Sequence, residues 1–136
     1  MSDYLLDSGI LIRHLRDHKG YPELLDRLTD EGDVLISVMT RFEVVRGMKD
    51  KERDSTLDLL SSLDTVMMNN EIADMAGEIV RSGRAKGISH GEADAIIAAT
   101  AMQHGLALVT TNAKHFSMHN LIVFEADEVG KITLRE

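Results

Sequence analysis

Short apolar segments alternate along this chain with longer segments whose apolar residues recur every three or four positions. The short segments lie at residues 3–6, 33–38, 65–68, 106–110 and 121–126, and we predict that they form five strands. Helical patterns fill most of the intervals, so the strands are joined by crossovers rather than by tight turns. Strands and helices that alternate in this way build a parallel sheet with helices on both faces. The pattern therefore predicts a three-layer α/β/α sandwich with a five-strand parallel sheet.

Proline, glycine and polar residues indicate where the helices begin and end. Pro22 suits the first turn of a helix over about 22–31, and Gly32 ends it. Ser89 is predicted to open an almost entirely apolar helix that runs to about His104. The other helices are expected around residues 10–15, 40–48, 51–63 and 71–86. The last ten residues are polar, and we expect them to be peripheral.

Length and composition narrow the possible functions. The 136 residues suffice for one domain with its own core, and we expect a single domain over residues 1–136. The chain has no cysteine, which excludes disulfides, thiolate zinc sites and a cysteine nucleophile. The sequence contains no recognisable signal peptide or membrane-spanning run, so we expect a cytoplasmic protein with no membrane contact. The net charge of −8 argues against a broad basic surface for nucleic acid, but not against a nuclease whose carboxylates bind cations.

Acidic and polar residues follow the predicted strands at the ends where open α/β sheets bind ligands. Asp7 comes directly after the first strand, and Glu43 is expected in the first turn of the helix after the second strand. Asp94 is expected near the start of the helix that precedes the fourth strand, and Thr110 and Asn112 come at the end of that strand. We hypothesise that these side chains converge at one rim of the sheet.

Ordinary structural roles would explain several of these residues taken singly. Asp7 is a favourable helix N-cap. Glu43 follows Thr40 by three residues, which is the spacing of a capping box, and Glu92 follows Ser89 in the same way. Asn112 fits a turn after the fourth strand equally well.

Asp94 is harder to explain as a cap. The segment after it is apolar on most sides, and the residues four and seven positions later are alanines, so no basic partner is local. A buried carboxylate must be paired or bind a metal ion. One explanation is an arginine from another element. The other is a Mg²⁺ or Mn²⁺ ion shared with Asp7 and Glu43, because a dication relieves the repulsion among three carboxylates and activates water for phosphodiester hydrolysis.

Three segments in order, YLLDSGILI, SVMTRFEVVRGM and EADAIIAATAMQHGLALVTTNAKHF, resemble the PIN domain, and specifically the VapC-type toxins of toxin–antitoxin pairs. The resemblance covers nearly the whole chain. It implies a five-strand parallel sheet between helices and an endoribonuclease that depends on Mg²⁺ or Mn²⁺. The metal-binding acids of the family match Asp7, Glu43 and Asp94.

The resemblance also assigns the residues around these acids. Ser8 matches the Thr or Ser that follows the first acid, and Thr110 matches the threonine before the last site position. Asn112 stands where many members have a fourth acid and others have asparagine, and it would orient a water or a ligand carboxylate.

The partners implied by the resemblance are an RNA substrate, a second copy of the chain in a homodimer, and a VapB-like antitoxin that blocks the acidic pocket. Candidate RNA contacts are Arg13, Arg46, Lys114 and His115, although a solvated surface charge is the ordinary role of each. Candidate residues of a hydrophobic groove for the antitoxin are Leu11, Leu15, Leu57 and Leu60, although ordinary core is the expected role of most of them.

Three other functions remain open at this stage. A metal-dependent phosphatase would use Asp7 as a nucleophile, but such enzymes often carry a second Asp two residues later, where this chain has Gly9. A non-catalytic α/β binding module would use the acids only as helix caps. A DNA nuclease would need the same acids as a ribonuclease.

Overall fold

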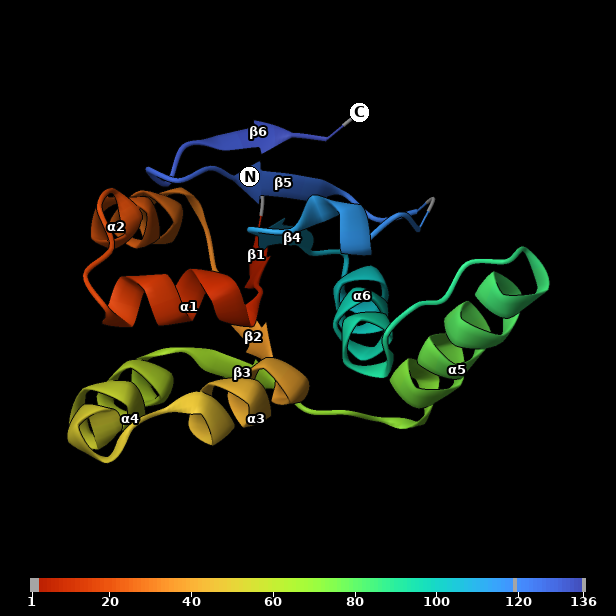
Figure 1. The fold of residues 1–136 in the computed structure, drawn as a ribbon, viewed down its shortest axis with the longest axis horizontal. Helices are drawn as coiled ribbons and strands as arrows, with labels where there is room; N and C mark the ends of the chain where they lie inside the picture. The colour runs from red at the N-terminus through yellow and green to blue at the C-terminus, as the bar shows by residue number, and fades with distance from the viewer. Residues whose placement is uncertain (1–2, 119, 136) are drawn as a thin grey trace.

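The computed structural model describes residues 3–118 and 120–135. Within these ranges one sheet contains six strands in the order β3-β2-β1-β4-β5-β6. The strands lie in this order from the bottom to the top of Figure 1. Their bounds are β1 Tyr4–Leu6, β2 Val34–Ser37, β3 Asp64–Val66, β4 Ala107–Thr110, β5 Val123–Ala126 and β6 Ile132–Leu134.

The first five strands pair in parallel, as the sequence predicts, and β1 occupies the middle of the sheet. Leu5 on β1 lies opposite Leu35 on β2 and Leu108 on β4. The predicted number of five strands is wrong by one, because β6 adds to the edge of the sheet antiparallel to β5. The C-terminal segment, expected to be peripheral, thus extends the sheet.

Six α-helices cover the two faces of the sheet in the described residues. Alternate residues of the strands point to opposite faces, so Tyr4 and Leu6 belong to one apolar core and Leu5 belongs to the other. The first core includes residues of α1, α2 and α4 together with Val44 of α3, and the second includes residues of α5 and α6. In Figure 1, α1, α2 and α4 lie on one side of the strands, and α5 and α6 lie on the other. The helix bounds are α1 Ser8–Leu15, α2 Tyr21–Glu31, α3 Val38–Gly47, α4 Arg53–Ser62, α5 Asn70–Ala85 and α6 Glu92–His104.

Helix α6 is apolar on nearly all sides because it lies between the sheet and α5 (Figure 1). Its residues Ala95, Ile97, Ala98, Ala99 and Ala101 are fully buried. No helix in the described part of the chain has both the length and the apolar character needed to cross a membrane.

The strand order creates a switch point beside β1. From β1 the chain moves outward to β2 and then to β3, and it later returns to β4 on the other side of β1. The connection that follows β1 is α1, and the connection that follows β4 contains a short 3₁₀ helix, η2, at Ala113–His115. Because connections diverge at such a point, open α/β sheets bind ligands at the carboxyl ends of these two strands.

Candidate active site

Asp7 lies at the switch point, directly after β1, and its carboxylate is fixed by two hydrogen bonds. Its Oδ1 accepts from the backbone N–H of Ser8 at 2.8 Å, so Asp7 is the N-cap of α1, as its ordinary structural role predicts. Its Oδ2 accepts from the hydroxyl of Thr110 at 2.7 Å, at the carboxyl end of β4. The first predicted acid is therefore held by a residue that lies 103 positions later in the chain.

Glu43 lies on α3, which begins where β2 ends. The prediction that Thr40 caps this helix is wrong, because Ser37 is the N-cap and its hydroxyl accepts from the N–H of Thr40 at 2.9 Å. Strand β2 passes into α3 without an intervening turn, which places the start of the helix three residues earlier than the S/T-x-x-E pattern suggests. Glu43 is therefore in the second turn rather than the first, and capping does not explain it.

The surroundings of Glu43 disfavour its negative charge. Partial burial raises the pKa of the Glu43 carboxyl, and the charges of Asp7 and Asp94 raise it further. Arg46 and the hydroxyl of Ser8 oppose this shift without reversing it. Ser8 thus acts at the site on both acids, through its backbone on Asp7 and through its side chain on Glu43.

Asp94 is the third residue of α6. The predicted start at Ser89 and the capping box with Glu92 are wrong, because α6 begins at Glu92 with Gly91 as its N-cap. The carboxylate of Asp94 therefore lies in the first turn, where the helix dipole favours an anion. It is also less enclosed than the apolar sequence around it predicts, with 29% of the side chain exposed.

The Asp94 carboxylate has no arginine partner among the described residues, and the side chain paired with it is a histidine. Nδ1 of His115 lies 3.6 Å from Oδ2 of Asp94. Burial raises the pKa of Asp94, and the charge of Asp7 raises it further, whereas His115 and His90 lower it. The fold thus brings the three acids close enough together that Asp7 and Asp94 disfavour the ionised form of Glu43, and Asp7 disfavours that of Asp94.

This donor set fits Mg²⁺ or Mn²⁺ in its chemistry. Carboxylate oxygens are hard ligands, and two of the three groups are destabilised as anions by burial and by their neighbours, which a dication would reverse. Within residues 3–118 and 120–135, however, no group of three His, Asp or Glu side chains has the spacing needed to coordinate a metal ion together. The arrangement is therefore an acidic rim whose oxygen ligands suit a hard dication.

Asn112 joins the two sides of this rim. Its backbone N–H donates to the hydroxyl of Thr110 at 3.1 Å, and Thr110 in turn donates to Asp7. Its side-chain amide nitrogen lies 3.1 Å from Nδ1 of His115, which is also next to Asp94. Asn112 is therefore both the residue that precedes η2 and a link between two of the acids.

Two residues that the sequence analysis missed hold the η2 turn in place. Glu125 on β5 accepts from the backbone N–H of Ala113 at 2.9 Å. Arg135, just after β6, donates to the carbonyl oxygens of Ala113 and Phe116. Glu125 could have been identified from the sequence, because it is the one acid within the apolar segment LIVFEA. Nothing in the polar C-terminal segment distinguishes Arg135 in the same way.

The candidate RNA contacts divide into two groups. Arg46 lies near Glu43, and Lys114 and His115 line a cavity beside Asp94. Arg13 instead packs over the ring of Tyr21, with 5.6 Å between the guanidinium carbon and the ring centre.

Two of the four candidate groove leucines have the other role expected for most of them, that of ordinary core residues. Leu11 and Leu60 are fully buried in the core. Leu15 lines a shallow groove between α1 and α3, and Leu57 is 37% exposed.

Known proteins resemble this chain in both sequence and fold. A PIN domain family model matches residues 4–119. Ribonuclease VapC10 of Mycobacterium tuberculosis is 36% identical over 114 residues, which are 84% of this chain and 86% of that protein. Ribonuclease VapC1 of Methanocaldococcus jannaschii is 29% identical over 116 residues, covering 85% and 79% of the two chains.

Solved structures give the same result. A chain of VapBC2 from Rickettsia felis, solved bound to a promoter DNA fragment, superposes with a TM-score of 0.79 at 27% identity, covering 92% of this chain and 99% of that one. A chain of a toxin–antitoxin complex from Klebsiella pneumoniae superposes with a TM-score of 0.71 at 28% identity, covering 84% and 90%. The region matched by the family model contains every candidate site residue and ends before β5.

Proposed function

This chain belongs to the PIN domain family, and we propose that it is a VapC-type endoribonuclease that hydrolyses RNA phosphodiester bonds at the acidic rim. The observation that carries the proposal is the coupling of three acids from distant parts of the chain. Asp7 and Asp94 both raise the pKa of Glu43, and Asp7 raises the pKa of Asp94. Relatives that match most of the chain carry the name ribonuclease.

The proposed cofactor is Mg²⁺ or Mn²⁺, held by Asp7, Glu43 and Asp94. When bound, the ion would neutralise the rim, polarise a phosphoryl oxygen and lower the pKa of the attacking water. The chain's own residues hold the ligands ready for this: Thr110 and the Ser8 backbone orient the two oxygens of Asp7. Asn112 would use its side-chain amide to orient a water molecule or a carboxylate.

The rival functions fit the structure less well. A second catalytic Asp at position 9 has little room, because a Cβ atom on Gly9 would lie 2.6 Å from the hydroxyl of Thr111. A module in which the acids only cap helices leaves Glu43 unexplained, since it lies beyond the first turn of α3.

The proposed partner is a VapB-like antitoxin, and the proposed assembly of the toxin is a homodimer. The support for the antitoxin is that similar chains come from toxin–antitoxin complexes. The acidic rim is complementary in charge to a basic side chain, so an antitoxin arginine or lysine inserted between the acids would inhibit the enzyme.

RNA cleavage by the purified protein tests this proposal. We expect single-stranded RNA to be cut with Mg²⁺ or Mn²⁺ and not in excess chelator. Asp94→Asn and Glu43→Gln should each abolish cleavage, whereas Asp30→Asn, a matched change on the exposed face of α2, should not. Cleavage that persists in chelator would disprove the metal mechanism, and cleavage of DNA but not RNA would favour the DNA nuclease.

A further inference from the structure

A groove leads away from the acidic rim along the end of α5. A cavity of about 330 Å³ beside Asp94 is lined by the loop before α6 and by the η2 turn. A second cavity, of about 210 Å³, adjoins it and extends along the last turns of α5. The two cavities share Ile88, His90 and Ser117, so they form one groove, which we call the α5 groove.

The charge of the α5 groove is opposite to that of the chain as a whole. The chain has 23 acidic residues and 15 lysines and arginines. Among the described residues that line the groove, two are lysines, Lys86 and Lys114, and one is an acid, Asp94, so the groove is net positive even with His90 and His115 counted as neutral, as they are in the net charge of the chain. A basic groove that begins at an acidic rim suits a polyanion whose reacting phosphate lies at the rim.

A buried glycine positions the side chain at the junction of the two cavities. Gly83 lies inside α5, where glycine costs about 1 kcal/mol relative to alanine. A Cβ atom at this position would lie 2.6 Å from Cδ2 of His90 and 2.8 Å from the carbonyl oxygen of Ile88. The N–H of Ile88 also donates to the carbonyl of Gly83 at 2.7 Å. The absence of a side chain at Gly83 therefore lets the loop lie against α5 with His90 half-buried in the groove.

We propose that the α5 groove binds the single-stranded RNA segment on one side of the scissile phosphodiester. Lys114 and Lys86 contact successive backbone phosphates, and the ring of His90 provides a stacking surface for a base. The inference rests on the proposed ribonuclease function and adds to it a location for the substrate. It also gives a role to the two lysines that line a groove beside Asp94 in a chain of net negative charge.

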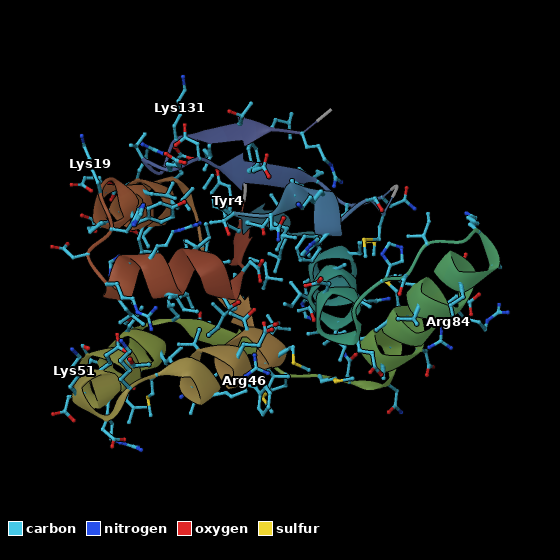
Figure 2. All side chains as sticks on the ribbon, in the orientation of Figure 1. Tyr4, Lys19, Arg46, Lys51, Arg84 and Lys131 are labelled. Atoms are coloured by element: carbon cyan, nitrogen blue, oxygen red, sulfur yellow. The ribbon has the colours of Figure 1, made fainter. Side chains whose placement is uncertain are left out.

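RNA binding without turnover tests the groove separately from catalysis. The probe is a fluorescein-labelled single-stranded RNA of about 12 nucleotides, a length within the range that such grooves bind. Anisotropy is measured with Ca²⁺ in place of Mg²⁺ at several salt concentrations, for wild type, Lys86→Glu and Lys114→Glu. Matched controls are Lys19→Glu and Lys51→Glu, because these exposed lysines lie on the opposite side of the molecule from α5, which carries Arg84 (Figure 2).

We expect both groove variants to bind several-fold more weakly than either control. Each removed phosphate contact should make the slope of log K against log salt less negative by roughly 0.7. In cleavage assays Lys86→Glu should raise KM for this RNA by a larger factor than it lowers kcat, because the proposed contact of Lys86 is with a phosphate outside the scissile position. Lys86→Arg should restore binding.

Two results would disprove RNA binding in the α5 groove without bearing on the proposed ribonuclease function. One is equal binding of RNA by wild type and all variants. The other is an equal loss of affinity in the groove variants and the control variants. Failure of the wild type to cleave RNA with any divalent ion would instead overturn the proposed function. The comparison of groove and control variants in the binding assay would still decide whether RNA occupies the groove.

Discussion

The most informative single substitution at the site is Thr110→Val, because it removes one hydroxyl and keeps the shape of the side chain. Thr110 is fully buried, and its Oγ1 makes two hydrogen bonds. It donates to Oδ2 of Asp7 at 2.7 Å and accepts from the N–H of Asn112 at 3.1 Å. Valine supports neither bond, so a carboxylate oxygen and a backbone N–H both lose their partner.

The size of the effect follows from these two bonds. A hydrogen bond to a charged group contributes about 1.5–3 kcal/mol, and one between neutral groups contributes about 0.5–1.5 kcal/mol. We therefore expect Thr110→Val to lower the free energy of unfolding by about 2–4 kcal/mol, which leaves a domain of ordinary stability folded. Because Asp7 also loses its fixed orientation, cleavage should fall by about 10- to 100-fold, as is usual when a residue that orients a metal ligand is changed.

Urea unfolding and RNA cleavage, measured on the same preparations, test this prediction. Thr110→Ser is the control, because it keeps the hydroxyl and loses only a methyl group, at a cost of about 1 kcal/mol. The reasoning is refuted if Thr110→Val is as stable as wild type, or if the serine variant is as impaired in cleavage as the valine variant.

Three further predictions concern the acids and the α5 groove. In chelator, Glu43→Gln and Asp94→Asn should raise the thermal stability at neutral pH, since both folded-state pKa values are raised and ionisation above them destabilises the fold. The excess over wild type should be absent below about pH 3, where the carboxyls are protonated in the unfolded chain as well as in the folded one, and should grow as pH rises through the ordinary carboxyl range and up to the raised pKa values; an excess that shrinks with rising pH would contradict this. Mg²⁺ or Mn²⁺ should raise the melting temperature of wild type and have less effect on Asp94→Asn, because binding to the folded state alone stabilises it; equal shifts would place the ion elsewhere. Gly83→Ala should lower the free energy of unfolding by about 1–3 kcal/mol despite the better helix propensity of alanine, because the new methyl group collides with His90 and the Ile88 carbonyl; urea unfolding that shows a gain would refute the close packing.

The central strands were predictable because burial on both faces leaves a continuous apolar run in the sequence. Leu5, Leu108 and Val109 are fully buried, and their segments stand out by composition alone. Strand β6 lacks this signal: Ile132 is half-buried, Leu134 is 52% exposed, and the strand is defined by its pairing with β5. An edge strand of this kind is specified by tertiary hydrogen bonds more than by composition.

The identities of the candidate acids followed from their positions after strands, but the details of the site did not. The S/T-x-x-E spacing predicted helix starts at Thr40 and Ser89. In the structure α3 begins where strand β2 ends, and α6 begins at Glu92, after the loop that packs on α5. The bond between Thr110 and Asp7 joins residues 103 positions apart, and no local pattern reports it. The same holds for His90 in the loop before α6, whose position depends on Gly83 in helix α5.

The most direct test of the central claim is anomalous scattering from crystals of the wild-type protein soaked in Mn²⁺. We predict a strong peak at the carboxyl ends of β1 and β4, in contact with the carboxylates of Asp7, Glu43 and Asp94 directly or through water, and no such peak in Asp94→Asn. A protein that cleaves RNA only with Mn²⁺ but whose crystals hold the ion at other residues, with none at this rim, would contradict the claim.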